Sequence, residues 1–237
     1  MLKVYPVLCR AGSMDNYCYI IQDEATKIAA IVDSSEPAVI IAKCQELGIV
    51  PQYILNTHHH FDHTDGNIEL KEYFGAKVVG NGNDKERIPG IDIEVYPNGT
   101  FALGESVAEI IDVSAHTQGH ILWYFPKDKV VFTGDTLFNL SIGGLFEGDV
   151  AQMFEALREI KKLPDDVLFY PGHEYTAHGA GFAQHVARNK EAVTAYLTKA
   201  AERLNAGLPA GPFTLGEEKS CNPYLMAESL AEFSRLF

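Results

Sequence analysis

Long apolar runs are absent from this chain of 237 residues. No stretch of about 18 apolar residues occurs, which excludes an ordinary membrane-spanning helix. The first residues, MLKVYPVLCRAGSMDNYCYII, have neither a basic start followed by an apolar run nor a small-residue cleavage site, so no secretory leader is expected. We therefore expect a cytoplasmic protein that does not bind a membrane.

Cysteine and positive charge are scarce as well. The four cysteines form no C-x-x-C pair, which argues against a disulfide framework and a thiolate zinc site and favours reduced packing residues; they are Cys9, Cys18, Cys44 and Cys221. Only 19 lysines and arginines stand against 32 aspartates and glutamates, for a formal net charge of -13. Nucleic acid is not an expected partner, because its phosphates need a basic patch. No pattern in the chain predicts an oligomeric state.

Hydrophobic residues make up 46% of the chain, enough for a sizeable core, and their spacing alternates between two periods. Short β-branched runs predict strands over residues 17–22, 27–33, 51–57, 76–80, 107–114, 121–126, 129–134 and 167–172. Helical spacing with start and stop signals predicts helices over 36–48, 67–75 and 150–163. Such alternation is typical of a layered α/β domain, which we place at residues 1–172.

From Gly181 the pattern changes to one long helix that ends at the turn sequence NAGLPAGP. Its apolar positions are Phe182, Val186, Val193, Leu197 and Leu204. The last residues, FTLGEEKSCNPYLMAESLAEFSRLF, predict a turn and one short helix. Residues 173–237 are therefore expected to form a helical addition to the α/β body.

The segment THHHFDHTDGN, residues 57–67, directly follows a predicted strand and precedes a predicted helix. In a loop at this place His58 and His60 can turn toward one metal ion, while Asp62 and His63 turn toward a neighbouring one. Imidazole and carboxylate are ligands that zinc, iron and manganese accept. The alternative is a polar loop at a helix start that contains chance histidines or binds metal adventitiously.

Three further segments place a ligand-type side chain after an apolar strand. His116 follows VAEIIDVSA, Asp135 follows KVVFTG, and His173 follows VLFYPG. Seven of the nine histidines lie in the first loop or within four residues of His116 or His173. Random placement seldom gathers histidines in this way, so the pattern favours a metal centre.

The pattern H-x-H-x-D-H with downstream His, Asp and His resembles the metallo-β-lactamase superfamily. Further blocks resemble its glyoxalase II branch, the hydroxyacylglutathione hydrolases: DNY (15–17), AHTQGHI (115–121), FTGDTLF (132–138), LFEGD (145–149), PGHEYTA (171–177) and TLGEEKSCNPY (214–224). The resemblance covers almost the whole chain. It implies an αββα sandwich, with residues 173–237 as a helical substrate-binding region.

The resemblance also implies two divalent metal ions per chain, zinc by first expectation and iron or manganese as alternatives. Its ligand set is His58, His60 and His116 for the first ion, Asp62, His63 and His173 for the second, and Asp135 between them. A hydroxide bridging the ions would attack a small-molecule thioester, since coordination lowers the pKa of water to about 7. Asp62 would orient this hydroxide and relay its proton. The implied products are a 2-hydroxy acid and glutathione.

Three other functions stay open at the level of sequence. One is an iron-dependent oxidoreductase of the persulfide dioxygenase kind on the same fold, which uses fewer ligands. Another is hydrolysis of a thioester whose carrier is not glutathione. A third is a metal-binding protein that has lost its substrate site and only binds a partner.

The chain departs from the glyoxalase II pattern where that family carries basic residues for the carboxylates of glutathione. Gly144 and Met226 occupy these two places. Tyr175 matches the family, and Phe146 stands where tyrosine is common, so both are predicted to bind substrate. Because charge-assisted contacts are the stronger kind, we expect glutathione thioesters to bind less tightly than in the family.

Four polar residues near these motifs have weaker signals. His59 is expected to point away from the metal, and His120 to be either a hydrogen-bonding neighbour of the ligands or an ordinary buried histidine. Asp65 either tunes the metals or caps the following helix, and we favour the cap. Lys219 is expected to be solvated.

Overall fold

The first sheet of the computed structural model, which describes residues 1–237, has the strand order β1-β2-β3-β4-β5-β6. Its strands are β1 (Leu2–Cys9), β2 (Asn16–Asp23), β3 (Ala29–Val32), β4 (Tyr53–Leu55), β5 (Lys77–Asn81) and β6 (Ile91–Val95). The first three are antiparallel, and β3 to β6 are parallel. Parallel neighbours need long crossovers. Helices α1 (Pro37–Leu47) and α3 (Asn67–Phe74) supply two of them.

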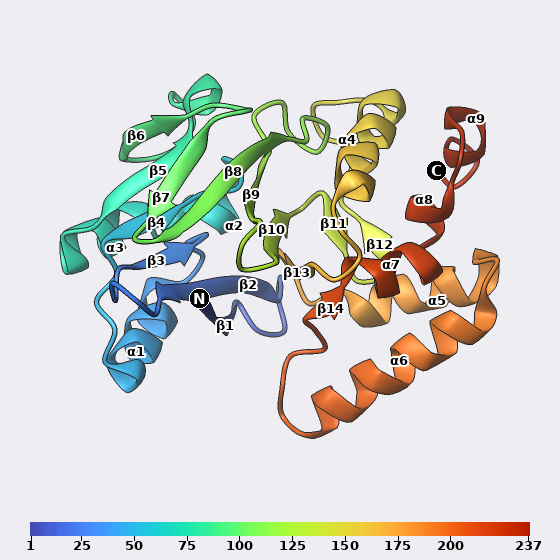
Figure 1. Cartoon of the computed structure of the whole chain (residues 1–237), viewed down its shortest axis with the longest axis horizontal. Coiled ribbons are helices and arrows are strands. Elements are labelled where there is room, and N and C mark those ends of the chain that lie inside the picture. The colour runs from blue at the N-terminus through green and yellow to red at the C-terminus, as the bar shows by residue number, and fades with distance from the viewer.

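The second sheet has the order β14-β13-β10-β9-β8-β7 and lies against the first (Figure 1). Its strands are β7 (Thr100–Leu103), β8 (Ser106–Asp112), β9 (Ile121–Phe125), β10 (Val130–Gly134), β13 (Leu168–Pro171) and β14 (Phe213–Thr214). Only β10 and β13 pair in parallel, and α4 (Val150–Lys162) connects them. Shorter elements complete this part: α2 (Phe61–Thr64), a 3-10 turn η1 (Gly82–Asp84), and the hairpin of β11 (Leu137–Phe138) and β12 (Ser141–Ile142).

Three hydrophobic clusters lie between the layers and hold them together. The middle cluster joins both sheets and contains Tyr19 and Val79 of the first with Trp123 and Phe132 of the second. An outer cluster lies between the first sheet and α1, around Ile40. The other outer cluster joins the second sheet to α4 and the C-terminal helices. Apolar surface is thus buried on both faces of each sheet, and the predicted αββα sandwich with a helical addition is confirmed.

The helical addition differs from its prediction in two respects: the long helix is divided, and the last residues form three short helices where one was predicted. The predicted long helix is two helices, α5 (Thr176–Val186) and α6 (Lys190–Asn205). The chain leaves the helical conformation at Ala187, and the Asn189 side chain caps α6 by accepting a hydrogen bond from the Ala192 N–H. The helical spacing of apolar residues continues across the break, so the sequence pattern does not reveal where the first helix ends. Three short helices follow: α7 (Leu215–Cys221), α8 (Pro223–Met226) and α9 (Leu230–Phe233).

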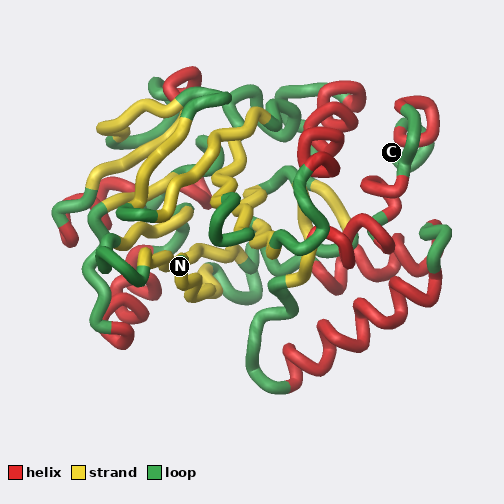
Figure 2. Tube along the Cα trace, in the orientation of Figure 1, coloured by secondary structure: helices red, strands yellow, loops and turns green.

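The helical addition is attached to the second sheet. Strand β14 pairs with β13, so the sheet ends in residues that follow α6. In Figure 2, the helices of the addition, in red, gather on one side of the strands. All predicted strands are present, whereas β1, β6, β7 and the two-residue strands β11, β12 and β14 were not predicted. The four cysteines are free and buried, as expected.

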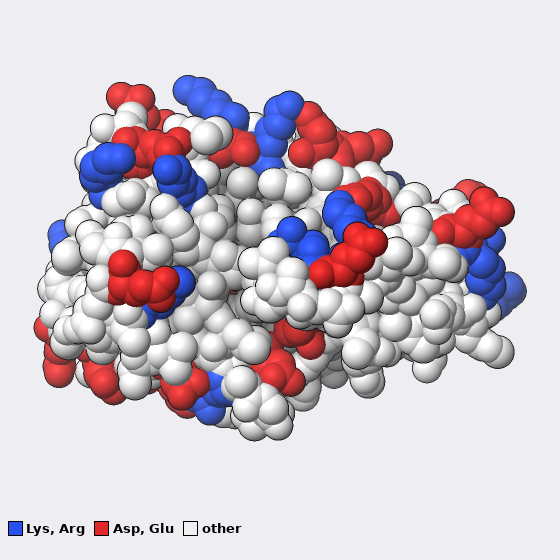
Figure 3. Space-filling model, turned by 90° about the horizontal axis from the view of Figure 1, so that it is seen from below, with Lys and Arg blue, Asp and Glu red and all other residues white.

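Every helix is too short or too polar to cross a membrane. On the face seen in Figure 3, Lys and Arg lie beside Asp and Glu in small mixed groups, with no broad basic patch on that face.

Candidate metal centre

The seven predicted ligands meet at one edge of the sandwich. Strands β4, β8, β10 and β13 all end there, and each is followed by ligand residues. Loops at one edge can direct their side chains inward while the strands hold the backbone. The structure groups the ligands in three overlapping sets whose ligand atoms lie within 4.8 Å of one another: His58, His60 and His116; His58, His63 and Asp135; and Asp62, His63 and His173.

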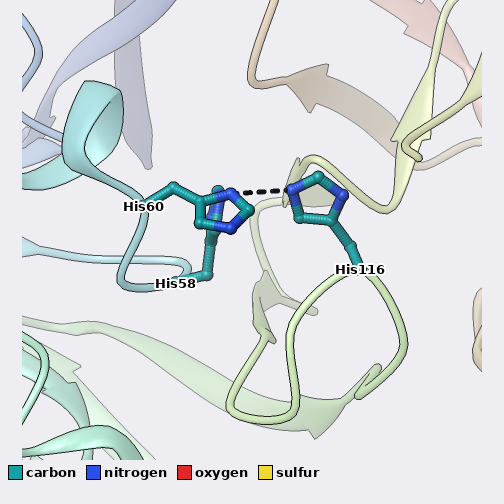
Figure 4. Close-up of side chains that lie close together, drawn as sticks. All are labelled: His58, His60 and His116. Atoms are coloured by element: carbon teal, nitrogen blue, oxygen red, sulfur yellow. Dashed lines mark hydrogen bonds between the residues drawn. The ribbon is translucent and has the colours of Figure 1, made fainter. Parts of the chain in front are cut away.

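The first group consists of three imidazoles that point at one another (Figure 4). His60 Nδ1 lies 3.1 Å from His58 Nε2 and 3.0 Å from His116 Nε2. His58 and His60 come from the loop after β4, and His116 from the loop after β8. Three ring nitrogens therefore surround one small volume.

The Nδ1 atoms of His58 and His116 form hydrogen bonds with groups outside this set. His116 Nδ1 donates to the Gly144 carbonyl at 2.7 Å. Thr57 gives its hydroxyl proton to Asp33 Oδ2 at 2.8 Å, so its oxygen accepts from His58 Nδ1 at 3.0 Å. Both Nε2 atoms then lack a proton and face His60. Burial lowers the pKa of all three rings, that of His58 well below its usual value and that of His60 to about 4, so all three are neutral, which is the form of imidazole that binds metals.

The second group combines two imidazoles with a carboxylate. His63 Nε2 and His173 Nε2 are 3.3 Å apart, and each lies 3.4 Å from Asp62 Oδ2. Their Nδ1 atoms donate away from the centre, His63 to Asp33 Oδ2 at 2.9 Å and His173 to the Met14 carbonyl at 2.8 Å. Outer partners of this kind fix the orientation of metal-binding histidines. Burial opposes charge, but Asp135 and Asp62 raise the pKa of His173 to about 9, so this place attracts a cation.

Asp135 lies between the two groups. Its Oδ2 is 3.5 Å from His116 Nε2 and 3.2 Å from His173 Nε2, and its Oδ1 is 3.2 Å from His63 Nε2. Burial alone would raise the pKa of this carboxyl, yet His63 and His173 hold it well below its usual range. The buried Oδ1 accepts no hydrogen bond. An ionised, buried and unpaired oxygen beside the ring nitrogens of His63, His116 and His173 fits two cations, which the donor set can hold.

Residues outside the predicted set support these ligands. Asp33 orients His63 directly and His58 through Thr57, and Asn16 Nδ2 donates to Asp62 Oδ2 at 2.9 Å. Asp33 ends a predicted strand, which is the signal that located the other ligands. Asn16 lies in the block DNY, but its spacing from Asp62 in the sequence carries no signal.

Two glycines permit the centre to close. A Cβ on Gly143 would lie 1.7 Å from the Asp135 carbonyl oxygen, and a Cβ on Gly172 would lie 2.2 Å from Asp135 Oδ1. Neither contact is possible for a real side chain. Their role follows from backbone approach, which a single sequence does not reveal.

The two further histidines of these loops take defined places. His59 points away from the ligands, as predicted, and its Nδ1 lies 3.1 Å from Asp84 Oδ2. His120 is buried, stacks on His58 with ring centroids 4.7 Å apart, and accepts from the Asp135 N–H at 3.0 Å. His120 therefore hydrogen-bonds to one predicted ligand, Asp135, and packs on another, His58.

Two predictions about charged residues are wrong. Asp65 does not cap the following helix: α3 begins after Gly66, and Asp65 Oδ2 instead accepts from Arg10 Nη2 at 2.7 Å, because Arg10 lies within reach of the loop. Lys219 is not solvated, since it donates to the Leu163 carbonyl at 2.6 Å and to Asp165 at 2.7 Å. Both pairs join segments that are distant in the sequence.

A cavity of about 350 Å³ opens over the ligands. Phe146 and Tyr175, the predicted substrate-binding residues, both line it, and so does Gly144. Met226 does not. The other lining residues are Met14, His60, Phe61, Asp62, His116, Asp135, Phe138, Gly143 and His173. Of the two expected basic positions, only that of Gly144 thus belongs to the cavity.

Known proteins resemble both parts of the chain. The model of the metallo-beta-lactamase superfamily matches residues 12–173, and that of the hydroxyacylglutathione hydrolase C-terminus matches residues 174–234. The hydroxyacylglutathione hydrolase of Pelagibacter ubique is 42% identical over 94% of this chain and 93% of its own length. Among solved structures, ETHE1 from Myxococcus xanthus has a TM-score of 0.74 at 24% identity, over 99% of this chain and 89% of that one. TTHA1623 in a di-iron-bound form has a TM-score of 0.61 at 28% identity, over 72% and 92% of the two chains.

Proposed function

This chain belongs to the metallo-beta-lactamase superfamily, and on that premise we propose that it is a metal-dependent hydroxyacylglutathione hydrolase that cleaves a thioester to a 2-hydroxy acid and a thiol. The observation that carries the proposal is the place of Asp135 between two complete ligand groups. A relative of that name shares 42% of its residues over nearly the whole chain. The C-terminal family match supports a helical substrate-binding region from residue 173 onward.

Two ions are proposed, held by the seven ligands with Asp135 shared. When bound, they supply a nucleophile near neutral pH and positive charge for the developing oxyanion. Zinc fits His and Asp donors, and iron fits them equally; TTHA1623 was solved with two irons. We therefore propose that each chain binds two ions of zinc or iron.

Asp62 is the proposed proton acceptor. Burial alone would raise its pKa, but hydrogen bonds from His173 and His63 hold it well below the usual range. The Asn16 side chain donates to the same oxygen and fixes its direction, and Asp62 lines the cavity. An ionised carboxylate at this place can orient the attacking water and take its proton. The thiol then leaves as a thiolate, since its pKa is about 8.5.

The substrate rests on the aromatic side of the cavity in this proposal. Tyr175 stacks on His173 with ring centroids 4.6 Å apart, and Phe146 lies edge-on to His60 at 5.2 Å. A thioester bound between these rings would bring its carbonyl over the ligands. Tyr175 and Phe146 thus hold the substrate and exclude bulk water.

The proposal is tested on purified protein of known metal content. We expect hydrolysis of S-lactoylglutathione, followed by loss of thioester absorbance, and no oxygen uptake on glutathione persulfide. Oxygen uptake with one iron per chain would overturn the hydrolase in favour of a dioxygenase. Absence of both activities would leave a metal-binding protein without this catalysis.

A further inference from the structure

The cavity over the metal ligands offers no lysine or arginine to a substrate carboxylate. None of its twelve lining residues is lysine or arginine, and its two lining carboxylates belong to the ligand set. The whole chain carries a formal net charge of -13. A substrate that enters with free carboxylates therefore meets no partner of opposite charge among the lining residues.

The arginines beside this cavity are already paired. Arg10 lies 5.4 Å from the ring centre of Phe61, but its guanidinium donates to Asp65 at 2.7 Å and to the Ser35 hydroxyl at 2.8 Å. An arginine held by a carboxylate has little net charge to offer a ligand.

Arg87 is satisfied in the same way. It donates through Nε to Asp84 at 3.0 Å and through Nη2 to Glu147 at 3.2 Å. Glu147 directly follows Phe146, so the charge next to that ring is negative and already neutralised by Arg87.

The mouth of the cavity is instead formed by exposed apolar groups. We call it the rim and define it as Met14, Phe61, Gly144, Phe146 and Tyr175. Phe146 is 71% exposed and Phe61 56% exposed. Their rings cover no protein core, and exposed aromatic rings at a cavity mouth are suited to binding apolar or amide surface.

We infer that the rim recognises the thiol carrier through its apolar and amide surface and not through its carboxylates, so that thioesters whose carrier has no free carboxylate are at least as good substrates as those whose carrier has them. The inference rests on the proposed thioester hydrolysis and names the carrier class that this site selects. Its physical reason is the missing counter-charge: desolvating a carboxylate without a partner opposes binding.

The test compares S-lactoylglutathione with its diethyl ester, in which both carrier carboxylates are esterified and the reacting group is unchanged. We expect kcat/KM for the ester to equal or exceed that for the acid. Added salt should raise kcat/KM for the acid relative to that for the ester, because it screens repulsion of the anionic acid and attraction of the ester, which keeps its ammonium group. An ester that is tenfold poorer, or a kcat/KM for the acid that falls with salt relative to that for the ester, would overturn the inference.

A matched pair of variants adds a gain of function. A Cβ on Gly144 would meet only the Phe146 ring, at 3.4 Å, so a side chain fits there. Gly144→Lys introduces a cation at the rim, and Gly144→Gln introduces a similar length without charge. We expect the acid-to-ester ratio of kcat/KM to be at least tenfold higher in the lysine variant. Equal ratios in the lysine and glutamine variants would show that the missing cation is not the cause of the carrier preference.

Binding gives a readout that does not depend on turnover. S-methylglutathione and its diethyl ester are not hydrolysed, and calorimetry measures their affinities. We expect the ester to bind at least as tightly as the acid, and tighter binding of the acid would overturn the inference. Hydrolysis of neither thioester, with both analogues bound, would instead overturn the proposed hydrolase and leave the carrier preference standing.

Discussion

The floor and the rim of the cavity are built by different rules. The floor consists of the seven ligand residues, which are almost all buried, and all of them except His60 are oriented by a partner or lie between groups. The rim is exposed, apolar and free of charge. The floor specifies which reaction is possible, whereas the rim selects the molecule that undergoes it. The first can therefore be shared across a superfamily while the second changes.

The largest effect is expected from a change in the floor. Asp62→Ala should lower kcat for thioester hydrolysis by about 10²- to 10⁴-fold, because the proton acceptor is lost. Asp65→Ala is the matched control: it removes a carboxylate three positions away that binds Arg10 outside the cavity. Steady-state rates and metal analysis of both variants check this. Similar kcat values in the two variants would remove Asp62 from the mechanism.

A second comparison sets two adjacent glycines against each other. Gly143→Ala should displace Asp135 and lower metal content below two ions per chain, because its Cβ would lie 1.7 Å from the Asp135 carbonyl oxygen. Overpacking of this kind costs about 1–3 kcal/mol. Gly144→Ala should retain both ions, since its Cβ reaches only the Phe146 ring. Metal analysis and thermal unfolding measure the difference. Equal metal loss in both variants would contradict the assignment of Gly143 to the floor and Gly144 to the rim.

Glu218 lies behind the hairpin that connects floor and rim. It is fully buried, accepts from the Leu140 N–H at 2.6 Å and from Asn222 at 2.8 Å, and its Oε2 has no partner. Burial raises its pKa to about 7. The folded state then binds a proton that the unfolded state has released, so the free energy of unfolding falls as pH rises from about 4.5 to about 7.

Glu218→Gln should remove this pH dependence. The difference in melting temperature, variant minus unmodified protein, should therefore be more positive at pH 8 than at pH 5.5. Glu217→Gln is the control, because Glu217 closes an N-terminal capping box on α7 and its pKa is lowered, so its loss should cost about the same at both pH values. Thermal unfolding at the two pH values measures both. A pH-independent difference for Glu218→Gln would contradict a buried, proton-binding carboxyl.

The smallest effect is expected at the rim. Phe146→Ala should raise KM about two- to tenfold, because a single exposed ring contributes about 0.5–1.5 kcal/mol, and should leave the metal content at two ions. Phe146→Leu, which keeps apolar area without the ring, should fall between. Measured KM values order the three proteins. A loss of kcat in place of a rise in KM would show that the ring acts on the floor.

The floor could be predicted from the sequence because its ligands follow strands. Apolar runs locate strand ends, and a polar side chain placed there is held by the sheet; His116 and His173 were found in this way. Asp33 carried the same signal. Asn16 and the close approach of Gly143 did not, because they depend on contacts between segments far apart in the chain.

The rim and the helical addition were less predictable. Apolar spacing runs through Ala187 without a sign of the break between α5 and α6, which depends on the cap at Asn189. The pairing of β14 with β13 involves two residues and leaves no periodicity. Arg10 looks like a free cation in the sequence, and only the fold brings Asp65 to it.

The most direct test of a two-metal thioester hydrolase is a titration of metal-free protein with Zn²⁺ in which bound metal and hydrolysis of S-lactoylglutathione are measured in the same sample. We predict that hydrolysis reaches its full rate only when the second ion per chain binds. The Asp135→Asn variant should not reach this rate at any zinc concentration. Full hydrolysis with one ion per chain, or two bound ions with no hydrolysis, would contradict this prediction.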